Sequence, residues 1–181
     1  PDLLAKAHTF AHIGVVRGAD RMRTTDDGGW YYEVQSFGLN YRLPDLLCAL
    51  GSSQLRRLAE FKARRQHLTA RYDELLADVP GLRLPTQREG VDPMRHLYPV
   101  RVLDGRRREV YDRMRAAGIL VQVNYIPVYW HPVYADLGYR RGMCPVAEAF
   151  YSEELSLPLF VDLTHAEQDR VVEELREILG S

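Results

Sequence analysis

Apolar residues recur at intervals of three and four along much of the chain, a spacing typical of amphipathic helices. This pattern predicts helices over residues 1–10, 43–79, 107–117, 145–155 and 164–179. Pro80-Gly81 ends the second of these helices and Gly118 ends the third, because proline lacks an amide N–H and glycine suits the turn after a helix. Thr164 and Glu167 have the spacing of a capping box at the start of the last helix.

Short stretches rich in β-branched and aromatic residues predict strands between these helices. They cover residues 30–34, 96–103, 119–123 and 157–160. The second and third strands enclose a helix, and such a strand–helix–strand unit is typical of α/β proteins. Residues 14–29 are polar and irregular. Residues 124–134 combine aromatics with Pro127 and Pro132, which predicts a shaped loop after a strand end.

The helical region 43–79 carries an apolar stripe that is expected to be buried. It begins with Leu46, Leu47, Ala49 and Leu50 and continues to Leu75 and Leu76. The opposite, solvated face is expected to carry the arginine pairs Arg56-Arg57 and Arg64-Arg65. The segment Gly51-Ser52-Ser53 marks a place where the helix can bend or another helix can approach closely.

A polar loop precedes this helical region at residues 35–42. Gly38 can adopt a positive φ, Asn40 offers amide donors and a carbonyl acceptor, and Arg42 offers a planar charged group suited to phosphate or carboxylate. Pro44 and Asp45 suit the first turn of the helix that follows. A polar loop held on a helix N-terminus can bind an anion. Because Asn-x-Arg before a helix is also a common cap with a surface ion pair, both interpretations stay open at this point.

Composition narrows the class of protein. The chain has 181 residues, of which 46% are hydrophobic and 27% charged, as expected of a soluble globular domain with its own core. Its formal net charge of -1 argues against nucleic acid as a partner. No apolar run is long enough to cross a membrane, so we expect no membrane partner and a cytoplasmic location.

Metal and disulfide chemistry have little support. Cys48 and Cys144 lie far apart and lack C-x-x-C spacing. His8 and His12 are four residues apart, as in some helical zinc sites, but no third ligand is near in the sequence, so no metal site is expected. The aromatic run at residues 30–32 either packs against a neighbouring domain or subunit or fills a core.

Several motifs occur in a fixed order along the chain. They are Phe37-Gly-Leu-Asn-Tyr-Arg-Leu-Pro-Asp45 with Ala49-Leu-Gly, then Val123-Asn-Tyr-Ile-Pro127, Pro145-Val-Ala-Glu148 and Ser156-Leu-Pro-Leu159. Together they resemble the DegT/StrS family of sugar-nucleotide aminotransferases, from about Phe10 to Leu179. Within that family, the segment NYIPVYWHPVY at residues 124–134 is most similar to the transaminases of pseudaminic acid biosynthesis.

The resemblance implies an enzyme of the aspartate aminotransferase fold that uses pyridoxal 5'-phosphate (PLP). Such enzymes move an amino group, usually from glutamate, onto a keto-sugar carried on a nucleotide diphosphate, and they are homodimers with active sites between the subunits. By resemblance, Asn40 would bind the cofactor phosphate of the partner subunit, and Tyr41 and Arg42 would lie near the nucleotide-sugar. Asn124 and Tyr125 occupy positions where many members have a histidine and an aromatic residue facing the sugar; the asparagine carries over no histidine role.

One feature of the family is missing from the chain. PLP chemistry requires a lysine that forms a Schiff base with the cofactor, and in the family this lysine lies upstream in an S-x-H-x-x-K type motif. The chain contains only Lys6 and Lys62, neither in that context, so no catalytic residue is assigned.

We therefore expect the C-terminal part of such an enzyme, inactive alone. Residues 1–42 would end the large domain and residues 43–80 would form a long connecting helical region. Residues 81–181 would form the small C-terminal domain of the fold, of α/β (α+β) class, with helices on a small antiparallel or mixed sheet.

A different class of protein stays open. A non-catalytic interaction or dimerisation module of the same fold would suit the aromatics at residues 30–32 and the polar run before them. A DNA-binding regulator would rest on helices and arginine pairs alone, and the near-neutral charge disfavours it.

Overall fold

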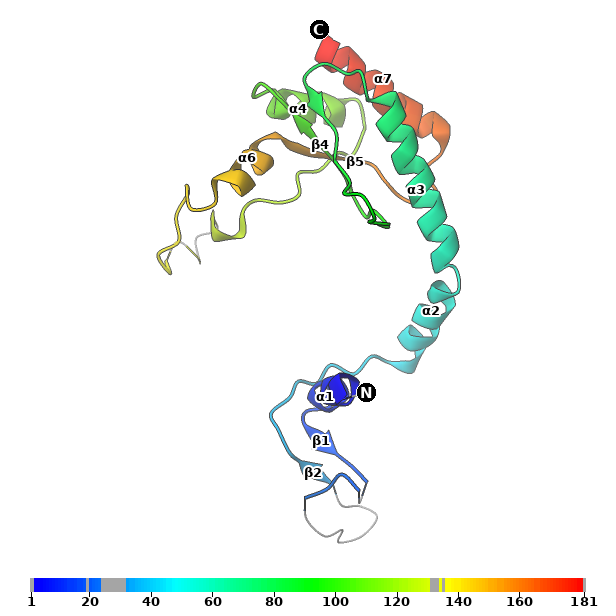
Figure 1. Ribbon diagram of the computed structural model, residues 1–181, viewed down its shortest axis with the longest axis vertical. Helices are drawn as coiled ribbons and strands as arrows, with labels where there is room; N and C mark the ends of the chain where they lie inside the picture. Colours follow the sequence, from blue (N-terminus) through cyan, green and yellow to red (C-terminus); the bar gives the residue numbers. More distant parts are fainter. Residues whose placement is uncertain (1, 19, 24–31, 131–133, 135, 181) are drawn as a thin grey trace. The chain divides into compact units, whose positions relative to one another are not determined.

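The computed structural model describes residues 2–18, 20–23, 32–130, 134 and 136–180. These residues form two compact units, Pro1–Arg56 and Arg57–Ser181, which are described separately (Figure 1). The domain boundaries after residues 42 and 80, which the sequence favours, stay a prediction.

The described residues of the first unit form two helices and one short strand pair. Helix α1 (Asp2–Ala11) confirms the first predicted helix, β1 (Val15–Val16) pairs antiparallel with β2 (Glu33–Val34), and α2 (Asp45–Leu55) follows. Strand β2 covers part of the strand predicted at residues 30–34, whose first two residues lie outside the described ones. Gly14 has φ 78°, and a Cβ there would lie 1.7 Å from the Ser36 carbonyl oxygen, so only glycine fits this close approach.

The region predicted as one helix over residues 43–79 is two helices, α2 and α3 (Leu58–Leu75), separated at Arg56 and Arg57. The break does not fall at Gly51, which lies inside α2. The expected burial of the stripe is wrong at its start: Leu46 and Leu50 are 79% and 55% exposed, because no described part of their own unit covers this face. The stripe becomes buried only in the second unit, from Leu68 onward.

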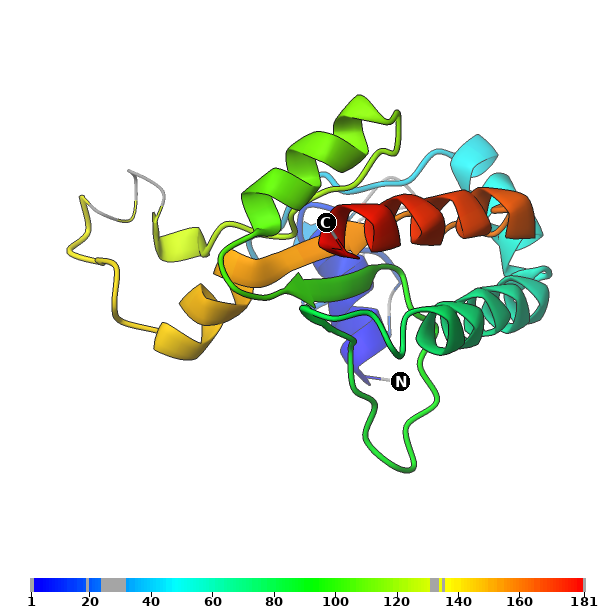
Figure 2. The same ribbon diagram turned by 90° about the horizontal axis from the view of Figure 1, so that it is seen from above.

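The second unit is an α/β structure built on an antiparallel sheet of order β3-β4-β5. Besides α3, its described elements are β3 (Leu82–Arg83), β4 (Tyr98–Val102), α4 (Arg107–Ala116), the 3-10 helix η1 (Val128–Trp130), α6 (Pro145–Glu153), β5 (Glu154–Leu157) and α7 (His165–Gly180). The register pairs Leu82 with Val102, and Tyr98 with Leu157. Figure 2 shows α4 and α7 next to each other over the sheet.

Two predicted strands differ from the observed ones. Residues 119–123 form no ladder; they contribute only the bridge Gln122–Ser156, although Ile119 and Val121 are buried. The strand predicted at residues 157–160 lies earlier, as β5, and shortens the helix predicted over 145–155. All four residues of β5 are buried, including the polar Glu154 and Ser156, so the strand lacks the alternation that marks a half-exposed one.

Two stacked tyrosines lie at the centre of the core. The rings of Tyr72 on α3 and Tyr98 on β4 are fully buried, with centroids 4.9 Å apart. The Tyr72 hydroxyl donates to the Pro158 carbonyl at 3.1 Å and the Tyr98 hydroxyl donates to Asp73 Oδ1 at 2.6 Å. Burial raises the pKa of both phenols, so both stay neutral donors.

The prediction that Arg64 and Arg65 are solvated is wrong, because both are half-buried and donate to backbone carbonyls. Arg64 binds the Val161 and Leu163 oxygens at 3.3 and 2.6 Å. Arg65 Nη1 lies 3.2, 3.3 and 3.2 Å from the oxygens of Arg95, His96 and Leu159. We call these two side chains the arginine clamps of α3; they satisfy carbonyls of irregular segments that have no ladder partner.

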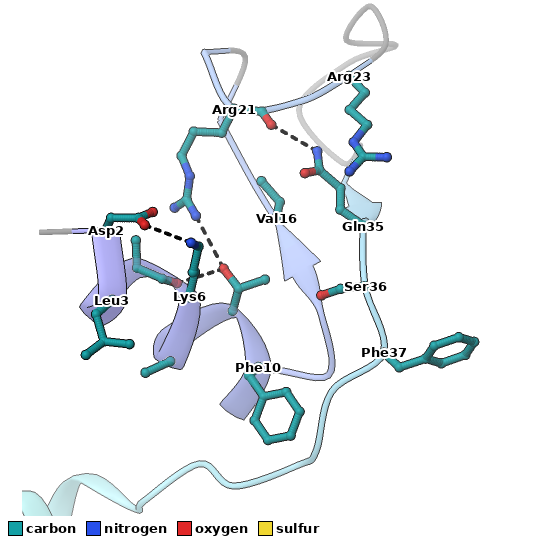
Figure 3. A pocket seen from close by; sticks show the side chains of 13 residues that line it. Asp2, Leu3, Lys6, Phe10, Val16, Arg21, Arg23, Gln35, Ser36 and Phe37 are labelled. Atoms are coloured by element: carbon teal, nitrogen blue, oxygen red, sulfur yellow. Dashed lines mark hydrogen bonds and ion pairs between the residues drawn. The ribbon is translucent and has the colours of Figure 1, made fainter.

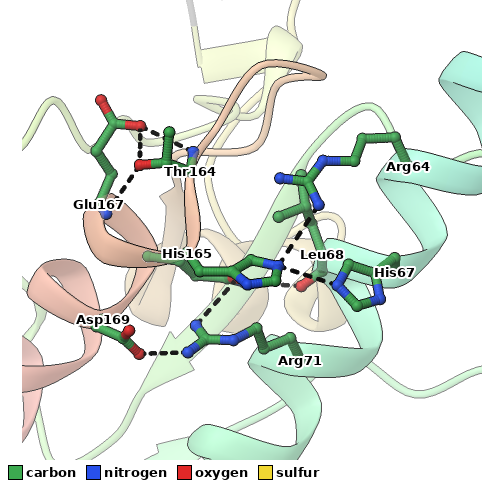
Figure 4. A network of polar contacts seen from close by, with 9 residues as sticks. Arg64, His67, Leu68, Arg71, Thr164, His165, Glu167 and Asp169 are labelled. Carbon is green, nitrogen blue, oxygen red and sulfur yellow. Dashed lines mark hydrogen bonds and ion pairs between the residues drawn. The ribbon is translucent and has the colours of Figure 1, made fainter.

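Polar contacts also join α3 to α7 (Figure 4). Arg71 pairs with Asp169 at 2.5 Å and donates to Gln168 Oε1 at 3.3 Å. The Gln168 amide donates to the Leu68 carbonyl at 2.8 Å. The predicted capping box is confirmed: the Glu167 N–H donates to Thr164 Oγ1 at 3.2 Å, and the Thr164 N–H donates to Glu167 Oε2 at 2.8 Å.

Candidate functional site

The loop before α2 is fixed by backbone hydrogen bonds to the end of α1. The Leu39 N–H donates to the Phe10 carbonyl at 2.8 Å, and the Tyr41 N–H donates to the Ala11 carbonyl at 2.9 Å. Gly38 does not adopt the positive φ expected of it. Its role is close packing, since a Cβ there would lie 2.5 Å from the Phe10 oxygen and 2.6 Å from the Gly14 nitrogen.

Asn40, Tyr41 and Arg42 follow on this loop, and all three side chains are exposed. Arg42 Nε donates to Asn40 Oδ1 at 2.9 Å. This contact uses the amide oxygen of Asn40 and orients its Nδ2 group as a donor, while the outer guanidinium nitrogens of Arg42 remain near the surface. The loop therefore presents an amide donor and a fixed positive charge together, which suits a phosphate or a carboxylate.

The first unit also contains a hollow that was not anticipated from the sequence. It has a volume of about 840 Å³ and lies between α1 and a set of residues around the short strand pair, namely Val16, Arg21, Arg23, Gln35, Ser36 and Phe37 (Figure 3). Gln35 Nε2 donates to the Arg21 carbonyl at 2.9 Å at its edge, and Phe10 and Phe37 supply apolar surface. None of the predicted site residues lines it.

Asn124 and Tyr125 lie in the second unit, on the segment that follows α4. The Asn124 backbone N–H donates to Glu154 Oε2 at 2.6 Å, and the other oxygen of Glu154 accepts the Ser156 hydroxyl at 2.6 Å. Burial raises the pKa of Glu154, opposed by these two hydrogen bonds and by the charge of Arg107. The buried Asn124 Nδ2 has no hydrogen-bond partner among the described residues.

Asn124 and Tyr125 line a cavity of about 600 Å³ that faces α4. Arg107, Tyr111 and Arg115 also line it, at a spacing of four residues that places them on one face of the helix. Sequence reasoning missed these three residues, although the i, i+4, i+8 pattern is visible in the sequence. The cavity combines guanidinium groups with aromatic walls and so suits an anionic ligand that also carries a flat ring.

Metal chemistry finds no support in the described residues, which contain no group of three or more His, Cys, Asp or Glu side chains able to hold an ion. The His8 and His12 rings stack at 4.2 Å, and His12 Nδ1 contacts the His8 carbonyl at 3.0 Å. Their spacing therefore serves a local contact. Within the same described ranges, no helix has the length and apolar character needed to span a bilayer.

The fold is that of known PLP aminotransferases. The aminotransferase TlmJ from Streptoalloteichus hindustanus superimposes with a TM-score of 0.85 at 30% identity, over 99% of this chain and 46% of that one. PseC from Helicobacter pylori, an aminotransferase of pseudaminic acid biosynthesis, superimposes with a TM-score of 0.86 at 25% identity, over 99% and 46%. These likenesses confirm the predicted fold class.

The profile of the DegT/DnrJ/EryC1/StrS aminotransferase family matches residues 1–176, and the chain belongs to this family. The Bacillus subtilis spore coat polysaccharide biosynthesis protein SpsC is 34% identical over 163 residues, 87% of this chain and 42% of that protein. The Saccharopolyspora spinosa dTDP-4-dehydro-2,3,6-trideoxy-D-glucose 4-aminotransferase is 33% identical over 182 residues, 98% and 46%.

The narrower resemblance to pseudaminic acid enzymes is weaker than these matches. The Campylobacter jejuni UDP-4-amino-4,6-dideoxy-N-acetyl-beta-L-altrosamine transaminase is 30% identical over 153 residues, 83% of this chain and 40% of that one. This chain thus spans less than half the length of each of these three relatives.

Proposed function

We propose that this chain is the C-terminal part of a PLP-dependent aminotransferase that moves an amino group from glutamate to a nucleotide-linked 4-keto-6-deoxy sugar. The observation that carries the proposal is the family match over residues 1–176. Relatives of this family include an aminotransferase named for a dTDP-linked 4-dehydro sugar. Because the chain spans less than half of these relatives, the rest of the enzyme would complete the site.

The chain's own residues fit part of a PLP site. Asn40 has an exposed amide donor beside the guanidinium of Arg42, which suits the cofactor phosphate. The lysines do not fit the cofactor lysine, since Lys6 pairs with Asp2 at 2.8 Å on an exposed surface and Lys62 pairs with Asp92. When bound, PLP supplies the electron sink for amino transfer, and the lysine that anchors it would belong to the rest of the enzyme.

Tyr41, Arg42, Asn124 and Tyr125 are the residues that we assign to nucleotide-sugar binding. We also propose a homodimer, with a second copy of the chain as the partner that would share the active sites. Exposed apolar side chains of the first unit support this assignment, because Phe37 and Leu46 are 101% and 79% exposed. The cytoplasmic location stays a prediction.

The test is amino-group transfer by the full-length protein that contains this chain. The protein is incubated with ¹⁵N-glutamate and separate UDP- and dTDP-linked 4-keto-6-deoxy sugars, and the sugar products are analysed by mass spectrometry. Incorporation of ¹⁵N with release of 2-oxoglutarate supports the proposal. Absence of ¹⁵N in every sugar would overturn it.

The same set of UDP- and dTDP-linked sugars shows which sugar substrate the protein prefers. The NYIPVYWHPVY segment supports the UDP-linked substrate of a pseudaminic acid-type pathway, for surface polysaccharide or related sugars. A relative named for a dTDP-linked sugar is 33% identical and the altrosamine transaminase is 30% identical, so sequence identity favours no single substrate. Preference for a dTDP-linked sugar would contradict the pseudaminic acid assignment alone.

The fragment status of the chain has a separate test. The 181-residue chain is incubated with PLP, reduced with borohydride and weighed by intact-mass spectrometry. We expect no adduct or only scattered, substoichiometric labelling, because both lysines lie in surface ion pairs and neither has the sequence context of the cofactor lysine. One full adduct at a single lysine would mean that the chain holds its own cofactor lysine.

A second candidate is a non-catalytic dimerisation module of the same fold. The exposed leucines of α2 favour it, because such a face needs a cover that its own unit does not provide among the described residues. Sedimentation of the 181-residue chain tests it. A strict monomer at all concentrations would contradict a module whose role is dimerisation.

A further inference from the structure

Glu148 accepts hydrogen bonds from two separate parts of the chain. Its Oε1 accepts the Tyr129 hydroxyl, the Trp130 indole N–H at 3.3 Å and the Gly142 backbone N–H at 2.6 Å. Tyr129 and Trp130 belong to η1, whereas Gly142 lies shortly before α6, the helix whose first turn carries Glu148. One carboxylate thus links η1 to the residues just before α6.

The protonation states of Tyr129 and Glu148 suit the hydrogen bond between them. The hydrogen bond from Tyr129 holds the pKa of Glu148 below its usual range, with burial opposing and the Gly142 and Trp130 donors assisting. Burial, together with the Glu148 contact, raises the pKa of Tyr129 to about 12. At neutral pH the phenol is therefore a neutral donor and the carboxylate a charged acceptor, which is a strong combination.

Two further side chains contact the Trp130 ring. The Arg141 guanidinium carbon lies 4.1 Å from the centroid of the ring. The ring meets Tyr151 of α6 edge to face at 5.4 Å. These contacts act on the same two segments as Glu148, so the carboxylate sits at the centre of a built cluster rather than at an isolated surface pair.

Tyr125 is connected to this cluster through Pro127. The Trp130 backbone N–H donates to the Pro127 carbonyl at 2.8 Å. Tyr125 and Pro127 form one wall of an apolar pocket of about 580 Å³, and Val146 and Phe150 of α6 form another. Tyr125 also lines the cationic cavity beside α4, so this residue borders two pockets of different chemistry.

We propose that Glu148 is a positioning residue for the nucleotide-sugar site. Its carboxylate holds residues 127–130 and Gly142 against α6 and thereby sets the place of Tyr125, which borders the two pockets. The inference rests on the proposed function, which makes Tyr125 a substrate-binding residue. Glu148 itself acts through the loop and need not contact the substrate.

The first test needs no enzymatic activity. The ¹⁵N-labelled 181-residue chain is compared by NMR with Glu148→Ala, Glu148→Gln and the control Glu177→Gln, an exposed position on α7. Trp130→Phe identifies the Trp130 indole resonance. We expect Glu148→Ala to shift this resonance and the Tyr125 and Ile126 amides. Glu148→Gln should shift them less, because its amide oxygen can still accept, and the control should leave them in place.

Two results of this measurement would overturn the inference. One is an unchanged Trp130 indole resonance in Glu148→Ala. The other is a shift confined to Trp130 and Gly142 with Tyr125 and Ile126 unmoved, which would make Glu148 a support of the loop alone. An Ala variant that fails to fold is recognised from its whole spectrum, and Glu148→Gln then decides between the two outcomes.

The second test uses the full-length protein. Loss of a charged hydrogen bond that only orients a binding residue is expected to raise KM for the nucleotide-sugar about tenfold or more in Glu148→Ala, with kcat within about threefold of wild type. Glu148→Gln should recover part of the KM. A loss of kcat of similar size in Glu148→Ala, with KM unchanged, would overturn the inference. A wild-type protein without transfer activity would overturn the proposed function instead, and the NMR result would still decide the role of Glu148.

Discussion

The imidazole Nε2 atoms of His67 and His165 lie 3.0 Å apart across the junction of α3 and α7. One ring must donate and the other accept, so the contact needs at least one neutral histidine. Arg64 and Arg71 also face His165, with Asp169 as the nearby acid. The junction therefore tolerates little additional positive charge.

This junction predicts loss of stability in mild acid. Burial, assisted by Arg71, Arg64 and His67, lowers the pKa of His165 below its ordinary value of 6.5. Because the unfolded chain then binds more protons than the folded one, stability falls as the pH drops through about 6.5. We expect the Tm to fall from pH 7.5 to 5.5, and to fall less in His165→Asn. Equal pH dependence in His165→Asn and wild type would contradict this; His8→Asn, in the other unit, is the control.

Two glycines of the first unit give a matched pair. Gly38→Ala would place a Cβ 2.5 Å from the Phe10 oxygen, whereas a Cβ at Gly51 meets nothing within 4 Å. We expect Gly38→Ala to lower the free energy of unfolding by about 1–3 kcal/mol. Gly51→Ala, inside α2, should raise helix stability by up to about 1 kcal/mol. Urea unfolding measures the free energy of unfolding of both variants. Similar effects at the two positions would show that the loop around Gly38 accommodates a Cβ without loss of stability.

The arginine clamps predict that lysine is a poor replacement. Arg65 reaches three carbonyl oxygens within 3.3 Å through its planar guanidinium group. A lysine ammonium has a different reach and geometry, so Arg65→Lys should cost about 1–2 kcal/mol of unfolding free energy. Arg56→Lys, at an exposed position just after α2, should change it by less than about 0.5 kcal/mol. Equal thermal stability of the two variants would show that the clamps contribute nothing specific.

Asn40 predicts a cofactor effect in the full-length protein. If its amide donates to the PLP phosphate, Asn40→Ala should release PLP about tenfold more readily during dialysis. Asn40→Asp should release more still, because a carboxylate repels phosphate. Absorbance of the retained cofactor measures the effect. Unchanged PLP affinity together with full activity in Asn40→Ala would remove Asn40 from the cofactor site.

The structural features that the sequence predicted correctly depend mainly on residues close together in the chain. The capping box of Thr164 and Glu167 and the strand predicted at residues 96–103, observed as β4, depend on neighbouring residues, and both were confirmed. The fold class followed from motifs in a fixed order. The assignments of Asn40, Tyr41, Arg42, Asn124 and Tyr125 stay predictions, although the structure does bring Asn124 and Tyr125 together in one cavity.

What could not be predicted depends on distant partners. Arg64 was expected on the solvated face because nothing near it in the sequence indicates carbonyls 97 and 99 residues away. Leu46 was expected in a core, since periodicity shows that a face is apolar but not what covers it. Glu148 belonged to a motif, yet its role required three donors to converge on one oxygen atom.

Arginine and lysine have different structural roles in this chain, and this difference matters for chemical labelling. Guanidinium groups hold the irregular segments onto α3, while the chain's two lysines form only surface ion pairs. Acylating reagents attack amines and leave guanidinium groups intact at neutral pH. An amine-reactive dye or cross-linker should therefore attach at Lys6, Lys62 and a free chain terminus without loosening the scaffold. Arginine-directed dicarbonyl reagents, by contrast, should unfold the second unit as they react.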